Sequence, residues 1–315
     1  MYLKDFNCTS DPNGVGQLLS DRACWQAALD CAYDNASGSF GTVVATQGVE
    51  YEIDGTLCVN TSYHGVIDGN GARLQWTGPN SEDSPMWFLV DTQQLKIENL
   101  RVHSVPGQPL DTAFEFTNKS ASGGVTPSGN ILDHVYIDGG AVNGLKYGVR
   151  FSFRLGYSID ANNDLSIIQD SLIMNPTVSA ISIEHGQSMY HRLINVGSVG
   201  AATASCSSFV SLHRRRLPAD GCNAITDELL GQGGSGSFSV YGFTGGGFTN
   251  ADYEISSAVS TNILIVQHNS ESSNRLLEAV GASDGVWPVH FIGGRFAVDA
   301  LDPDDHTWIH FDRQG

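Results

Sequence analysis

The densest group of residues that could carry chemistry lies between Tyr157 and Arg192. It holds carboxylates, imidazoles and phenols: Tyr157, Asp160, Asp164, Asp170, Glu184, His185, Tyr190 and His191. Glycoside hydrolysis needs two carboxyl groups about 5 to 9.5 Å apart, one protonated as an acid and one ionised as a base or nucleophile. The residue types therefore predict a hydrolytic site with the catalytic candidates Asp160, Asp164, Glu184 and His185.

A step of 25 residues brings two of these candidates together. Asp170 and Asn195 occupy equivalent places in a repeat and are 25 positions apart. The same step predicts that Asp160 stacks beside His185 at about 4.8 Å, the spacing of neighbouring strands. A carboxylate beside a histidine raises the imidazole pKa and orients the ring. Substrate contacts are expected from residues flanking this group, namely Tyr157, Tyr190, His191 and Arg192.

Two other functions remain open for the same region. A polysaccharide lyase needs a base that removes the proton next to a uronate carboxyl group, and Tyr190, His191 and Arg192 could supply it. Only 16 Lys and Arg occur in the chain, which is few for a uronate substrate. The second alternative is a non-catalytic virion or adhesion protein whose flank only binds glycan.

The acidic residues also suggest simpler interpretations. Asp160, Asn162 and Asp164 resemble the start of a calcium loop, but Leu165 and Ser171 stand where that loop has its glycine and glutamate. Asp and Asn are also favoured at chain corners, where they bond local backbone amides. We therefore predict that the protein binds no metal or cofactor. Calcium is the one metal that these residues suggest as an alternative.

These residues must be positioned by a repeating architecture. An apolar residue followed two places later by a small polar residue or glycine recurs, with third positions at 69, 99, 134, 170, 195, 242, 267 and 293. The differences are 30, 35, 36, 25, 47, 25 and 26, and we interpret 47 as two steps of about 25. Periods of roughly 20 to 50 residues indicate solenoids, propellers or arrays. Alternating segments such as 179–183 indicate strands rather than helices. The prediction is an all-β, single-stranded, right-handed parallel β-helix.

Composition narrows the partners. The formal net charge of -18 argues against nucleic acid, whose phosphates would be repelled. It also favours a neutral glycan over a polyanionic one. No apolar run reaches the roughly 18 residues that a membrane span needs. We therefore expect a polysaccharide partner and no membrane insertion.

The first forty residues are predicted to cap the coil. Ser20 and Asp21 offer helix-capping chemistry before a helix-forming stretch that includes Trp25 and Leu29. Six cysteines permit three disulfides. Cys206 and Cys222 could staple an excursion, whereas Cys24 and Cys31 are predicted to lie too far apart for a bridge.

The opening residues carry a family resemblance. Lys4-Asp5-Phe6, Asp11-Pro12-Asn13-Gly14, Gln26-Ala27-Ala28-Leu29 and Asp68-Gly69-Asn70-Gly71-Ala72 resemble the start of pectate-lyase-like β-helix proteins. That family includes phage tailspikes and secreted polysaccharide lyases and hydrolases. The resemblance implies a glycan-recognising protein, extracellular or virion-associated, and allows for a homotrimer. Glu184-His185-Gly186 only partly matches the Gly-His-Gly of pectin hydrolases, and the paired Asp-Asp of those enzymes has no counterpart.

Three regions are expected. Residues 1–40 form a cap with a short helix, residues 41–297 form the β-helix, and residues 298–315 close its far end.

Overall fold

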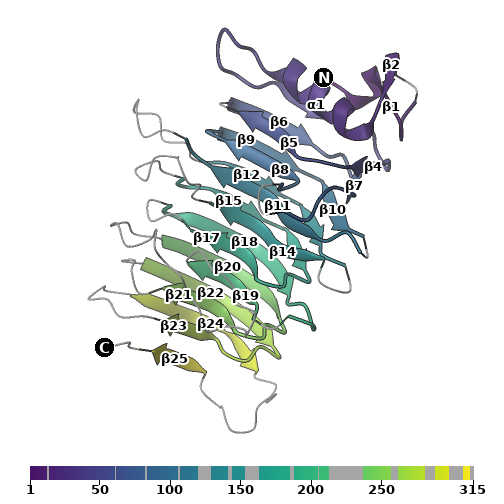
Figure 1. The fold of residues 1–315 in the computed structure, drawn as a ribbon. Helices are drawn as coiled ribbons and strands as arrows, with labels where there is room; N and C mark the ends of the chain where they lie inside the picture. The colour runs from purple at the N-terminus through teal and green to yellow at the C-terminus, as the bar shows by residue number, and fades with distance from the viewer. Residues whose placement is uncertain are drawn as a thin grey trace.

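The structure is a computed structural model whose strands stack into one continuous coil beneath an N-terminal cap (Figure 1). It describes residues 1–12, 14–60, 62–81, 84–105, 107–119, 129–140, 144–152, 163–184, 188–204, 206–212, 237–256, 262–280, 288–297 and 308–312. All strand pairs in the two large sheets are parallel, so the prediction of a parallel β-helix is confirmed.

The first large sheet contains two rows of short strands, which later merge. Row one is β3 (Thr42–Val44), β6 (Tyr63–Asp68), β9 (Gln93–Glu98), β12 (Ile131–Asp133) and β15 (Ile167–Gln169). Row two is β4 (Glu50–Ile53), β7 (Arg73–Trp76), β10 (Arg101–Ser104), β13 (Tyr136–Asp138) and β16 (Leu172–Met174). From β18 onward one long strand spans both rows in each coil: β18 (His191–Val199), β20 (Ser237–Gly246), β22 (Asn262–Glu271) and β24 (Val289–Ala297).

The second large sheet adds one strand per coil. Its members are β5 (Leu57–Asn60), β8 (Trp87–Val90), β11 (Leu110–Thr117), β14 (Leu145–Phe151), β17 (Ser179–Ile183), β19 (Ser208–Leu212), β21 (Ala251–Ser256), β23 (Leu277–Val280) and β25 (Ile309–Asp312). Because β25 pairs with β23, part of the predicted closing segment 298–315 belongs to the last coil.

The strand register follows the repeat. Aligned inward residues are Ile67, Ile97, Leu132, Ile168, Leu193, Val240, Ile265 and Phe291. The interpretation of the step of 47 as two coils is wrong, since β18 pairs directly with β20 and Leu193 aligns with Val240. That step is one coil with a long insertion after β19.

Left-handed residues mark the corner between the two rows. Positive φ angles occur at Asn70, Asn99, His134, Asp170, Asn195, Gly242, Gln267 and Gly293. Asn and Asp tolerate this conformation better than most residues, and glycine adopts it at no steric cost. Side-chain bonds tie successive corners together, with Asn99 Nδ2 donating to Asp68 at 3.1 Å and Asn195 Nδ2 donating to Asp170 at 3.1 Å.

The cap consists of four elements: η1 (Leu3–Asp5), β1 (Phe6–Cys8), β2 (Val15–Leu19) and α1 (Asp21–Ala32). The Ser20 hydroxyl caps α1 by accepting from the Ala23 amide at 3.3 Å, as the sequence predicts. Buried Trp25 packs edge-on against Tyr51 and Trp87, each at 5.7 Å, which closes the apolar interior of the first coils.

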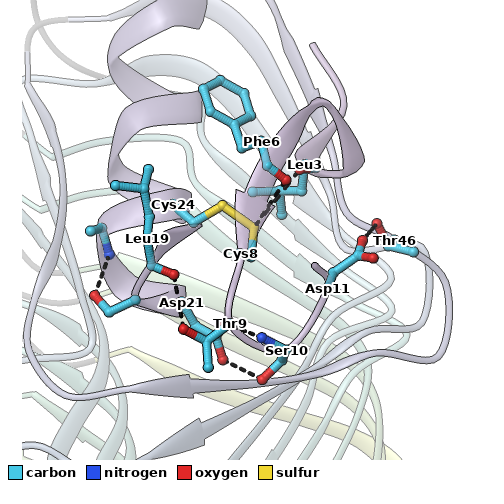
Figure 2. The surroundings of a disulfide bond; sticks show 12 residues. Leu3, Phe6, Cys8, Thr9, Ser10, Asp11, Leu19, Asp21, Cys24 and Thr46 are labelled. Carbon is cyan, nitrogen blue, oxygen red and sulfur yellow. Dashed lines mark hydrogen bonds between the residues drawn. A yellow bond between two sulfur atoms is a disulfide. The ribbon is translucent and has the colours of Figure 1, made fainter. Parts of the chain in front are cut away.

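A disulfide that sequence reasoning did not consider joins Cys8 to Cys24, with their Cα atoms 5.6 Å apart (Figure 2). It links β1 to α1. Cys31 is a free thiol, so the prediction that it does not bridge Cys24 is confirmed. Cys206 is disulfide-bonded, while its predicted partner Cys222 lies outside the described residues. Within the described part of the chain, no helix is long and apolar enough to cross a membrane.

Candidate functional site

The predicted hydrolytic group is only partly described. Tyr157, Asp160 and His185 lie outside the described residues, so the predicted stacking of Asp160 on His185 stays a prediction. Asp164 precedes β15 at the corner between the two large sheets, where Leu165 and Tyr190 have positive φ. Its Oδ1 accepts from the Met189 amide at 2.8 Å, 25 residues along the chain. Burial raises the pKa of Asp164, and the hydrogen bond from Met189 opposes that shift.

Glu184 lies in a different environment from the one expected. It follows β17 and is 1% exposed, and its Oε1 accepts from Arg150 Nε at 2.6 Å. Burial disfavours the charge of Arg150, but Glu184 and the nearby Tyr147 and Glu115 hold the pKa of the guanidinium well above its ordinary value. Glu184 and Arg150 form a buried structural ion pair, so we do not include Glu184 in the proposed catalytic group.

The three predicted substrate contacts that follow β17, Tyr190, His191 and Arg192, lie in two different environments. His191 lies in the interior, 1% exposed, with its ring stacked on Phe151 at 4.1 Å and Nε2 bonded to Ser188 Oγ at 2.6 Å. Burial lowers the pKa of His191 to about 3, so the ring is neutral at ordinary pH. We do not retain it as a substrate contact. Tyr190, which is 60% exposed, and Arg192 face solvent.

A row of solvent-facing side chains runs along row two, and sequence reasoning did not single it out. Strand register aligns Glu50, Arg73, Arg101, Tyr136, Leu172, Gly197, Thr244, Asn269 and Arg295. We call this row the axial strip. None of its members is buried. Eight steps of about 4.8 Å give it a length of roughly 38 Å. It therefore crosses nine coils as a continuous outer surface.

Two hollows open on the axial strip. The first has a volume of about 470 Å³ and is lined by Arg101, Tyr136 and Leu172 of the strip and by the corner residues Asn99, His134 and Asp170, among others. The second, of about 610 Å³, is lined by Thr244, Asn269 and Arg295 of the strip together with the glycines 245–247. Because both hollows lie on the axial strip, a single extended ligand can occupy them together.

Asp133 and Lys96, beside the first hollow, are tightly paired. The buried carboxylate of Asp133 contacts Lys96 Nζ at 2.8 Å and His134 Nδ1 at 2.6 Å. Burial would raise the pKa of Asp133, but the hydrogen bonds from Lys96, Gln169 and His134 outweigh it and lower that pKa. Donor atoms of Asp133, His134 and Asp170 lie within 4.8 Å of one another. Both Asp133 oxygens are engaged by Lys96 and His134, so we do not propose this group as a metal site.

The fold is similar to those of several solved structures. The Streptococcus pneumoniae surface protein and adhesin PfbA matches at 9% identity with a TM-score of 0.42, over 98% of this chain and 100% of that one. The catalytic domain of an α-1,3-glucanase in complex with nigerose matches at 9% identity with a TM-score of 0.41, over 94% of this chain and 67% of that one. A mutant tailspike protein of E. coli bacteriophage HK620, in complex with a pentasaccharide, matches at 11% identity with a TM-score of 0.35, over 92% of this chain and 65% of that one.

Similarity at this level concerns the fold alone and carries no argument about function. No protein-family model and no curated protein matches the chain.

Proposed function

We propose that this protein binds a polysaccharide along the axial strip. The observation that carries the proposal is that two hollows of about 470 and 610 Å³ lie on one ladder of solvent-facing residues. A linear polymer matches this geometry because its repeated units can contact successive rungs. Amide, hydroxyl and phenol groups on the strip and its corner suit sugar hydroxyl groups, and the Tyr136 ring offers an apolar face.

We propose further that the protein hydrolyses its glycan at a separate site, the corner between the two large sheets that precedes β15, with Asp164 as the general acid. A general acid must be protonated near the working pH, and the raised pKa of Asp164 supports that role. Asp160 remains the proposed second carboxylate and Tyr190 and Arg192 the proposed substrate contacts. An extracellular or virion-associated location belongs to the same proposal, and the Cys8–Cys24 disulfide supports an oxidising compartment.

A matched pair of variants tests the hydrolysis. Asp164→Asn is expected to lower the release of reducing ends about 100-fold or more, with glycan binding retained. The control is Asp138→Asn, since Asp138 likewise caps a corner by accepting from the Gly140 amide at 2.9 Å. Equal activity of the wild type and Asp164→Asn, on a glycan that the wild type cleaves, would remove Asp164 from the mechanism.

The same assay separates the alternatives. An unsaturated, ultraviolet-absorbing product would identify a lyase in place of a hydrolase. Glycan binding without either product would identify a non-catalytic binding protein. A homotrimer is a further proposal, and the molar mass in light scattering tests it.

A further inference from the structure

The described cations differ in whether they have an acidic partner. Most described cations have an acidic partner: Arg73 has Glu50 at 2.9 Å, Lys96 has Asp133 at 2.8 Å, Lys146 has Asp111 at 2.6 Å, Arg150 has Glu184 at 2.6 Å and Arg295 has Glu271 at 3.2 Å. Arg101 differs from these. Across the described part of the chain, its guanidinium has no hydrogen bond or ion pair.

The free guanidinium of Arg101 lies in the first hollow. It is exposed and adjoins Tyr136 on the next rung of the axial strip. Its charge acts on the Tyr136 phenol, whose pKa is raised by burial and by Asp138 and lowered in part by Arg101. A guanidinium presents a planar fork of donors that matches a carboxylate in two parallel hydrogen bonds. In a chain of net charge -18, this is a local attachment point for an anion.

The first hollow also carries a negative charge, two coils further along the β-helix from Arg101. Asp170 is exposed and lines the hollow, and its Oδ1 accepts from Asn195 Nδ2 at 3.1 Å. Two strand steps separate the coil of Arg101 from that of Asp170, or roughly 10 Å. A second anionic group there would be repelled, whereas a sugar hydroxyl group could donate to the Asp170 carboxylate. The charges therefore favour one acidic sugar followed by a neutral one.

We propose that the first hollow binds an acidic heteropolysaccharide, with a uronate carboxylate on Arg101 and the hydroxyl groups of a neutral sugar on Asp170. This inference rests on the proposed function and refines it, since it names the class of glycan. It also replaces the expectation of a neutral glycan that net charge alone suggested. The whole-chain charge acts at long range and is screened by salt, whereas a direct ion pair depends on local geometry.

The test compares three glycan classes on the full chain by calorimetry. The probes are a hyaluronan hexasaccharide (alternating acidic and neutral sugars), hexagalacturonate (all acidic) and cellohexaose (all neutral). The wild type is expected to bind the alternating probe most tightly. Arg101→Gln should weaken that binding about tenfold or more, with Arg101→Lys intermediate because it keeps the charge and loses the fork. Lys4→Gln removes an equal charge from the cap and should change nothing.

A gain of binding provides the second arm. Asp170→Asn removes the proposed repulsion and is expected to tighten the binding of hexagalacturonate several-fold, which loss of structure could not produce. If cellohexaose binds as tightly as the alternating probe and Arg101→Gln changes neither affinity, the acidic class is wrong while glycan binding stands. If no probe of any charge binds, both this inference and the proposed function are overturned.

Discussion

Replacing Glu184 by alanine is expected to destabilise the coil rather than to act on catalysis alone. The substitution removes the partner 2.6 Å from Arg150 Nε and leaves a guanidinium that is 3% exposed without its nearest counter-charge. Breaking a buried pair from one side costs about 3 to 5 kcal/mol. The Tyr147 ring, 5.1 Å from the guanidinium carbon, and the charge of Glu115 offset part of the loss, which favours the lower end, about 3 kcal/mol.

The free energy of unfolding in urea, followed by tryptophan fluorescence, measures this cost. Replacing both partners, as Arg150→Met with Glu184→Leu, should restore part of the stability, because neither charge of the pair remains, while buried Glu115 loses the nearby guanidinium. The control is Glu50→Ala, which breaks the exposed pair with Arg73 and should cost at most about 1 kcal/mol.

Two results would refute this reasoning. The first is a free energy of unfolding of Glu184→Ala within about 1 kcal/mol of the wild type, and the second is a double variant that loses as much stability as Glu184→Ala. A third outcome, loss of glycan cleavage at unchanged stability, would return Glu184 to the catalytic group.

Two further predictions concern the core and the cap. Burial lowers the pKa of His191 from 6.5 to about 3. Between these pH values, His191 is protonated in the unfolded chain and neutral in the folded chain. Stability should therefore fall by about 1.4 kcal/mol per pH unit between these values, and His191→Phe should flatten that part of the urea-derived profile. Replacing Cys8 and Cys24 together by alanine should cost about 3 kcal/mol, because the bond closes a loop of 16 positions. Hydrogen exchange is expected to speed up in α1 and not in β14, and uniform acceleration would contradict a local role.

The register of the coil could be predicted from the sequence, because the corner residues recur. Asn99, His134 and Asp170 need a left-handed conformation at the same point of successive coils, and residue types that tolerate it are few. The step of 47 misled because it is close to two steps of about 25, and only the pairing of β18 with β20 shows that it is one coil.

The candidate site was harder to predict, and one error was avoidable. Leu193 is an inward ladder residue, so the alternation of a strand already implied that His191 faces inward too. The burial of Glu184 could not be predicted in this way. The outer face of β17 is as buried as its inner face, and strand alternation says nothing about what covers an outer face. The axial strip was missed because its members share a position and not a residue type.

Despite the insertion between β19 and β20, β18 and β20 keep one register, from His191 on Phe238 to Val199 on Gly246. The length of chain between two coils therefore does not determine which residues of those coils stack on each other. A loop at such a junction can lengthen, shorten or change its chemistry while the rungs on both sides keep their neighbours. Surface variation of this kind would cost the scaffold little, so closely related chains could differ widely in what they recognise.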